Sequence, residues 1–384
     1  MRRNLQLVLK ISFIVLFLFS GLLIHSQTKT VIDPFTIPSA RFSALGGNHA
    51  AMGDTFHAIF TNPASFVDIK GEFSAAEISI STYGPIFELT DVLISNLHSS
   101  GDLDLSGGKF SSTGFDMAGP ISLGWVGKGL GLGLFNRLKI DAEINSTNIM
   151  PGISGEILLV AGYSFRVINH KSHWLDLGFL GKGFFRGVVG FNTYMLNISD
   201  LLEDPLEHPF STYLGMGIDL GIRYTFRENL AFSVVCFDVF SPVLETPYKT
   251  IQDFTDFSGK SLDSSYASVK RRLDFGIKWT IRNRFLNRNI TRLTLMADYH
   301  DLLDLFTNKL IPRNPVLNAG IGLEMLVLDA LSFRFGITDA LPSFGIGLSL
   351  KFMTLDFAIF GRELGKDPGK YPTYGLALGI LFRY

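Results

Sequence analysis

The chain has 384 residues, of which 34 are Lys or Arg and 35 are Asp or Glu, so its formal net charge is −1. This balance argues against a nucleic-acid partner, which would require a basic excess. A single cysteine, Cys236, excludes an internal disulfide framework and a cysteine-based structural zinc site. Hydrophobic residues make up 47% of the chain and the mean hydropathy is +0.27, yet no long apolar run follows residue 24. This distribution favours membrane-spanning strands over membrane-spanning helices.

Residues 1–27 have the pattern of a secretory signal peptide. Two arginines and a lysine precede an apolar run at residues 11–24, which is shorter than the roughly 20 residues of a bilayer-spanning helix. The polar sequence HSQTKT follows and predicts cleavage near residue 27, with an uncleaved anchor as the alternative. No cysteine lies nearby, which argues against a lipoprotein anchor. We therefore expect an exported mature chain.

Residues 28–70 show no strand-like alternation and are expected to lie in the periplasm or the barrel lumen as a hatch. Their central part reads SARFSALGGNHAAMGDTFHAIFTNPASF (39–66). The sequence GGNHAAMGD lacks the Gly-Lys-Ser/Thr ending of a phosphate loop and follows no strand. The spacing of His49, Asp54 and His57 matches no metal motif. We expect neither a metal nor a cofactor.

Apolar side chains in the same segment would have no lipid to contact. We expect Phe42, Phe56, Ile59 and Phe60 to bury against each other or to line a pocket for a hydrophobic ligand. The run of small residues at 44–53 is expected to pack closely against a wall.

From residue 71 to residue 384 the sequence repeats short segments in which apolar side chains alternate. The last one, YGLALGILFRY, places Tyr374, Leu378 and Phe382 on one face, with aromatic residues at both ends as in membrane-interface girdles. Many runs reach ten or more residues, against a usual ~5–6 in soluble sheets and the ~9–11 that cross a membrane. We therefore predict an all-β fold, a 14-stranded antiparallel transmembrane β-barrel in the outer membrane of a double-membraned bacterium. The predicted strands are 71–83, 116–127, 130–143, 153–168, 174–186, 212–226, 229–240, 268–281, 290–303, 314–326, 330–339, 343–353, 354–362 and 373–384.

The inward face of this barrel is predicted to carry charges of both signs, which are expected to pair with each other or with a plug. A strongly selective ion pore would more often show one sign at a constriction. Asp298 and His300 share this face, but no serine motif accompanies them, so we expect no catalytic residue and no enzyme. The charges assigned inward by parity are Arg272, Asp274, Lys278, Arg292, Asp298, Glu324, Arg334, Lys351, Asp356 and Arg362.

The arrangement of signal peptide, glycine-rich segment and fourteen strands resembles the FadL/TodX family of outer-membrane transporters for long-chain fatty acids and other hydrophobic compounds. The strongest motif is Ala-Leu-Gly-Gly (44–47) followed by Asn62-Pro63-Ala64. Residues 333–365 are also similar to the late strands of FadL-like barrels, including spirochaete paralogues. The resemblance implies passive uptake of a hydrophobic ligand through a plugged barrel. Asn62, Pro63 and Ala64 would then belong to the hatch, and Gly46 and Gly47 would be its close-packing points.

The family also has a disrupted strand that opens the wall sideways, and we predict that Asn136, the one polar residue on the lipid face of 130–143, marks such an opening. The loop 84–115 is the expected place for an outside capture helix. A long-chain fatty acid or similar ligand and outer-membrane lipids are the expected partners of a monomer. Two alternatives stay open: a non-transporting barrel that serves as a platform for surface or secreted proteins, and a general porin.

Overall fold

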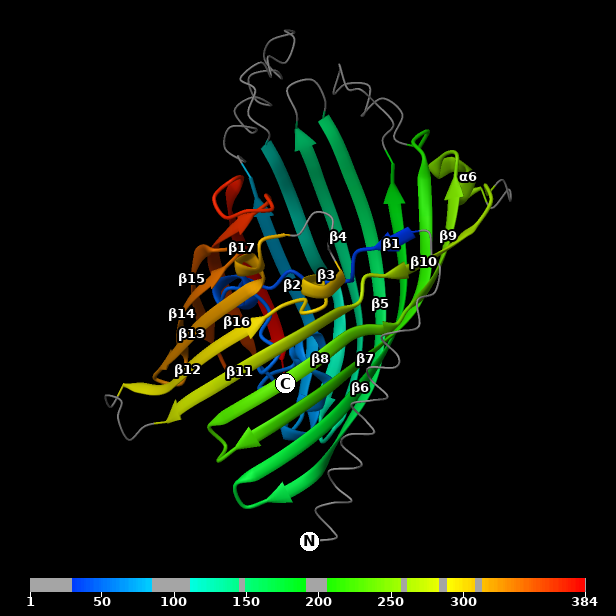
Figure 1. The fold of residues 1–384 in the computed structure, drawn as a ribbon. Helices are drawn as coiled ribbons and strands as arrows, with labels where there is room; N and C mark the ends of the chain where they lie inside the picture. The colour runs from blue at the N-terminus through cyan, green and yellow to red at the C-terminus, as the bar shows by residue number, and fades with distance from the viewer. Residues whose placement is uncertain are drawn as a thin grey trace.

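The computed structural model describes residues 30–84, 111–144, 149–190, 206–256, 261–282, 289–307 and 313–383. They form a closed barrel around a folded N-terminal segment (Figure 1). The predicted signal peptide and most of the loop at 84–115 lie outside the described residues. Within these ranges, no helix is long and apolar enough to cross a membrane.

The wall is a single antiparallel sheet that closes where its last strand pairs with its first, β17 with β2. The segments β8 and β9 follow each other in the chain, and both pair with β7. The segments β10 and β11 also follow each other, and β10 pairs with β9 while β11 pairs with β8. Each of these two pairs forms one wall strand, so β2 to β17 make fourteen, as the sequence predicts. The segments are β2 (Glu72–Tyr83), β3 (Ser111–Gly127), β4 (Leu130–Ile144), β5 (Ile149–His170), β6 (His173–Val189), β7 (Phe210–Phe226), β8 (Leu230–Phe240), β9 (Pro242–Tyr248), β10 (Ser265–Val269), β11 (Arg272–Arg282), β12 (Ile290–Tyr299), β13 (Ala319–Val327), β14 (Leu331–Thr338), β15 (Leu341–Ser349), β16 (Met353–Glu363) and β17 (Pro372–Arg383).

Several strand ends differ from the predicted ones. The strand predicted at 290–303 ends at Tyr299, and the chain continues into the short helix α7 (Asp304–Thr307). The strand predicted from 314 begins only at Ala319, because Pro315 has no N–H for a ladder and starts the 3₁₀ helix η2 (Pro315–Asn318). Strands β3 to β7 have between 15 and 22 residues, more than lipid requires, because ladder pairing continues beyond the membrane.

The outer face of the wall is apolar. Leu214 and Met216 on β7 are 60% and 61% exposed, and Tyr374 and Leu378 on β17 are each 56% exposed. Their neighbours in sequence point inward and are mostly buried, as the predicted alternation requires. An apolar surface of this extent is costly in water and fits the hydrocarbon of a bilayer.

Residues 33–70, called the luminal segment below, lie inside the barrel and are blue in Figure 1. They contain the helices α2 (Ala40–Ala44) and α3 (Ala58–Thr61) and the 3₁₀ helix η1 (Pro63–Asp68). Helix α2 packs against β14 to β17 and β2, whereas η1 packs against β3 to β7 on the other side. The segment also shares an apolar core with the wall, in which Phe56 and Phe66 are completely buried.

The short strand β1 (Thr30–Ile32) precedes the luminal segment and joins the wall. It pairs in parallel with β10. The strand β12 pairs with β11 and does not reach β10, so this edge of β10 is open to β1. Val31 is 61% exposed on the outside, while Ile32 packs against the apolar core of the luminal segment. The strand β1 cannot be recognised in the sequence, because three residues are too few to show alternation.

Candidate functional site: the barrel lumen

The Asn-Pro-Ala triplet (62–64) seats the luminal segment against β6 and β7. Asn62 is completely buried, and its Oδ1 atom accepts a hydrogen bond from the Ala64 N–H at 2.9 Å, which caps η1. Its Nδ2 atom donates to the carbonyl oxygen of Ile222 in β7 at 3.4 Å. A Cβ atom on Gly221 or on Gly178 would overlap the triplet. These wall glycines therefore allow the close approach.

Gly46 and Gly47 differ in their surroundings. Gly46 has a φ of 78°, and a Cβ atom there would lie 2.7 Å from the backbone nitrogen of Ile337 in β14. Gly336 of β14 faces Gly46. A Cβ atom on Gly336 would overlap the backbone of Gly46, and a Cβ atom on Gly46 would overlap the backbone of β14. Gly47 has a φ of 114°, but its nearest neighbour, His300 Nε2, would be 3.5 Å from a Cβ atom. Gly46 is therefore a close-packing point, whereas Gly47 is required by its backbone conformation.

Three buried ion pairs tie the luminal segment to acidic residues of the wall. Arg41 Nη2 lies 2.9 Å from Glu324 Oε2, and His49 Nδ1 lies 2.5 Å from Asp298 Oδ2. His57 Nε2 lies 2.8 Å from Glu77 Oε1. Burial opposes the charge on His57, but the Glu77 carboxylate outweighs this effect and raises the pKa of His57. The luminal segment thus supplies partners for some of the charges inside the barrel.

Other inward charges pair within the wall. His300 Nδ1 lies 3.1 Å from Asp274 Oδ2, so its partner is Asp274 and not its strand neighbour Asp298. Lys351, predicted to point inward, lies in the turn between β15 and β16 over the ring of Phe352, because β15 ends at Ser349. Among the residues with described positions, no group of three or more His, Cys, Asp or Glu could hold a metal ion.

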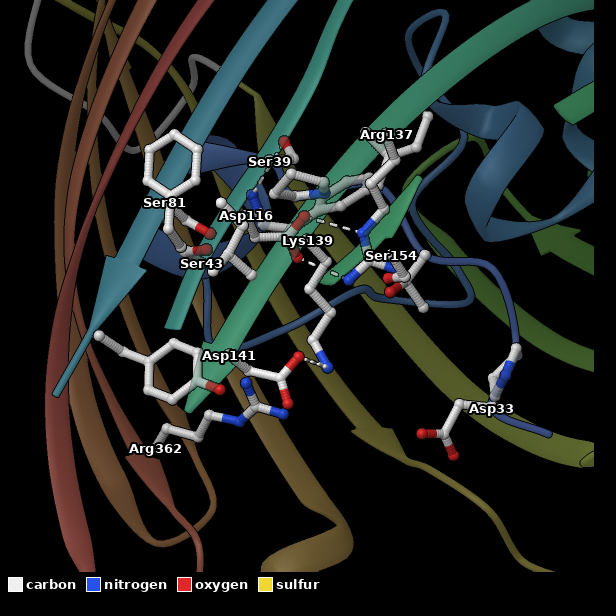
Figure 2. Close-up of a pocket in the computed structure, with 18 of the residues that line it drawn as sticks. Asp33, Ser39, Ser43, Ser81, Asp116, Arg137, Lys139, Asp141, Ser154 and Arg362 are labelled. Carbon is white, nitrogen blue, oxygen red and sulfur yellow. Dashed lines mark hydrogen bonds and ion pairs between the residues drawn. The ribbon is translucent and has the colours of Figure 1, made fainter. Parts of the chain in front are cut away.

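A cavity of about 760 Å³ lies between the luminal segment and the wall (Figure 2). Its wall side is strongly charged. Arg137 on β4 pairs with Asp116 on β3, with Nη2 and Oδ2 2.6 Å apart, and Lys139 Nζ lies 3.2 Å from Asp141 Oδ1. The sequence analysis considered only the lipid face of this strand. Arg137, Lys139 and Asp141 occupy every second position, and that alternation is the signal that identifies them as luminal.

A second cavity of about 100 Å³ adjoins the first. Most of its lining residues are apolar, and the charged residues Lys182, Asp219, Asp238 and Arg272 complete the lining. Phe42, Ile59 and Phe60 of the luminal segment line it, opposite Leu158 and Leu180 of the wall. Phe42 also lines the larger cavity, so the two meet there. The sequence predicts that Phe42, Phe56, Ile59 and Phe60 either bury against each other or line a pocket, and whether they bind a ligand stays a prediction. Phe56 lines neither cavity, because it packs fully buried against Phe135 of β4.

The ladder of the wall is interrupted in β3. Ala118 pairs with Arg137 of β4, and the next pair is Ser122 with Phe135, so residues 119–121 face the single residue Asn136. Asn136 Oδ1 accepts a hydrogen bond from the Ile121 N–H at 3.0 Å, and its Nδ2 atom donates to the Gly119 carbonyl at 3.1 Å. Asn136 therefore satisfies backbone groups that the interruption leaves without ladder partners. The register of β3 with β2 shifts at the same level.

A closed barrel with an apolar exterior, a polar interior and a folded segment in its lumen defines the class: an outer-membrane β-barrel. The sequence matches no protein-family model and no curated protein.

Similar folds occur among solved structures. The CymD monoaromatic hydrocarbon channel is 12% identical, with a TM-score of 0.47 and coverage of 92% of this chain and 98% of that one. The Ralstonia pickettii toluene transporter TbuX is 13% identical, with a TM-score of 0.46 and coverage of 91% and 97%. A Pseudomonas aeruginosa FadL homologue is 12% identical, with a TM-score of 0.44 and coverage of 92% and 99%.

Proposed function

We propose that the protein takes up long-chain fatty acids or other hydrophobic molecules passively across the outer membrane. The observation that supports this function is the apolar cavity at Phe42, Ile59 and Phe60, which adjoins a larger cavity inside a membrane-spanning barrel. An apolar recess beside a wetter chamber allows a hydrophobic molecule to leave water before it passes the wall.

The luminal segment is the hatch in this proposal. It fills the barrel and is held by the Asn-Pro-Ala triplet, by Gly46 against β14, by Gly47 in its backbone turn and by the three buried ion pairs. In this proposal a ligand leaves the cavities sideways through the interruption of β3. Among the described residues, the side chain of Asn136 is the only group that bridges from β4 to residues 119–121 there. The exit of a hydrophobic molecule into the bilayer avoids a second transfer into water.

Binding and uptake test this function directly. The purified protein in lipid nanodiscs is expected to bind a fluorescent long-chain fatty acid saturably. A deletion strain is expected to take up a radiolabelled fatty acid more slowly than the same strain complemented with the gene. Absence of saturable binding together with normal uptake by the deletion strain would refute the proposal.

The hatch assignment has its own test. Asn62→Ala is expected to lower uptake while the barrel still assembles. The change removes the hydrogen bonds of Asn62 with Ala50, Ala64 and Ile222 and leaves every wall residue in place. Asn289→Ala, in the turn before β12, is the matched control and should leave uptake unchanged. Loss of assembly in Asn62→Ala would instead make the triplet a folding element.

A further inference from the structure

The larger cavity contains a pattern of charge that a purely hydrophobic ligand does not use. Four cationic and five anionic side chains line it: Arg137, Lys139, Arg186, Arg362, and Asp33, Asp116, Asp141, Glu156 and Asp339. A cavity for hydrocarbon alone would be lined mainly by apolar groups with few polar ones. The balance of the two signs also differs from a site for a simple anion or a simple cation.

Most of these charges neutralise each other. Arg137 pairs with Asp116, Lys139 with Asp141, and Arg186 with Glu156. Asp339 is held by Arg313, with Oδ1 and Nη2 2.7 Å apart. Paired groups of this kind offer little net charge to a ligand.

Two charges of opposite sign have no such partner. Arg362 on β16 is exposed, and no carboxylate of the described residues forms an ion pair with it. Its guanidinium carbon lies 4.9 Å from the centre of the Tyr83 ring, which holds the group in place without neutralising it. Asp33 is likewise exposed, and its carboxylate has no cationic partner within the described ranges. Its backbone carbonyl accepts a hydrogen bond from Arg186 Nη2 at 2.9 Å, which fixes its position.

Arg362 and Asp33 lie on different sides of the same cavity. Figure 2 shows Asp33 well apart from Arg362, and Asp33 is the first residue of the luminal segment. Pro34, Ile37 and Phe42 line both this cavity and the smaller apolar one, so the apolar recess begins next to Asp33. The cavity volume of about 760 Å³ is within the usual range of ligand pockets, ~300–1,000 Å³.

We propose that this cavity selects single-chain amphiphiles with a zwitterionic headgroup, whose negative group faces Arg362, whose positive group faces Asp33 and whose chain enters the apolar recess. A fatty acid would satisfy Arg362 but leave its carboxylate beside the free charge of Asp33. A cationic amphiphile would satisfy Asp33 but leave its positive charge beside the free charge of Arg362. A zwitterion matches both charges. The inference rests on the proposed uptake function, because it specifies the class of ligand for the same lumen.

Three amphiphiles with the same twelve-carbon chain separate the contributions of charge: dodecyl sulfobetaine, dodecyl sulfate and dodecyltrimethylammonium. The chain of the sulfobetaine is attached to its cationic nitrogen, so the cation lies beside Asp33 at the recess and the sulfonate at the far end of the headgroup faces Arg362. With protein in nanodiscs, we expect dodecyl sulfobetaine to bind up to about fivefold more tightly than either of the others, as one screened ion pair predicts. Arg362→Gln should abolish its advantage over dodecyltrimethylammonium, and Asp33→Asn should abolish its advantage over dodecyl sulfate. Lys366→Gln and Asp329→Asn, outside the cavity, are the matched controls and should keep both preferences.

The outcomes distinguish this inference from the proposed function. Equal binding of dodecyl sulfate and dodecyl sulfobetaine, or unchanged preferences in both cavity variants, would overturn the zwitterion site, while saturable binding of a fatty acid would leave the uptake function intact. Failure of all three amphiphiles and of the fatty acid would overturn both. Assembly of each variant is checked by the heat-dependent gel mobility of the folded barrel.

Discussion

The Nε2 atom of His57 lies 2.8 Å from the Oε1 atom of Glu77, and this pair joins the luminal segment to the interrupted part of the wall. Glu77 lies on β2 between Ser74 and Ser79, where the pairing of β2 with β3 shifts its register. The carbonyl oxygen of Glu77 also packs so closely against Gly119 that a Cβ atom there would overlap it. One residue therefore contacts both the segment proposed to move and the site proposed to open.

Glu77→Gln is expected to loosen the luminal segment and leave the barrel assembled. The change removes the charge from a buried hydrogen bond, at a cost of about 2 kcal/mol. Hydrogen exchange measured by mass spectrometry should then be roughly 30-fold faster at residues 57–61. Glu245→Gln is the control, because the hydrogen-bond partners of its carboxylate among the described residues, Tyr213 and Ser265, belong to the wall. Equal acceleration at 57–61 in both variants would show that the effect is not specific to this link.

The same pair predicts a pH dependence. Burial and Arg41 oppose the charge on His57, but Glu77, assisted by Glu72, raises the pKa of His57 above the 6.5 of a free imidazole. The pair therefore stabilises the luminal segment fully below about pH 6.5, and this contribution is lost as the pH rises through the raised pKa. We expect exchange protection factors at 57–61 to fall as the pH rises above about 6.5 in the natural protein and to stay level in His57→Gln. An equal fall in the variant would contradict the assignment.

Asn136→Ala is expected to speed the release of ligand into lipid. The change leaves the Ile121 N–H and the Gly119 carbonyl without their hydrogen bonds, which weakens the ladder at the interruption by about 1–3 kcal/mol. The measurement is the rate at which a bound fluorescent fatty acid transfers to vesicles, compared with that of Asn169→Ala at the exposed end of β5. If exchange at residue 121 rises while the transfer rate stays the same, the ligand does not leave at this point.

The barrel could be predicted from the sequence because two simple constraints act on every strand. The pleat alternates side chains, and lipid requires one apolar face, so segments such as 374–384 identify themselves. The contacts of the lumen could not be predicted, because they join residues far apart in the chain. Nothing near His57 indicates Glu77 as its partner, and Asn136 reads as a polar exception until residues 119–121 are placed opposite it. The ends of β12 and β13 depended on local breaks at Asp301 and Pro315.

Gly221→Ala is expected to displace the Asn-Pro-Ala triplet. The new methyl group would lie 2.1 Å from Asn62 Oδ1, 3.1 Å from Pro63 Cδ and 3.2 Å from the Ala64 backbone nitrogen, so the triplet must shift. We expect a loss of about 2 kcal/mol in the docking of the luminal segment, measured as faster exchange at residues 62–66. Gly183→Ala is the matched control, because a Cβ atom at Gly183 has nothing within 4 Å among the described residues. Unchanged exchange in Gly221→Ala would mean that the triplet is not held by this contact.

A disulfide between β1 and β10 tests whether the start of the luminal segment must leave the wall during uptake. Val31 and Ser268 are partners in the parallel ladder, and neighbouring strands are ~4.8 Å apart, a distance that a disulfide can bridge. In a Cys236→Ser background, oxidised Val31→Cys/Ser268→Cys is expected to take up fatty acid slowly and to recover on reduction. Phe333→Cys/Ile346→Cys, between β14 and β15, is the control and should transport equally in both redox states. Full uptake by the oxidised β1 variant would show that uptake does not require β1 to leave the wall. Any movement of the hatch would then be confined to residues C-terminal to Ile32.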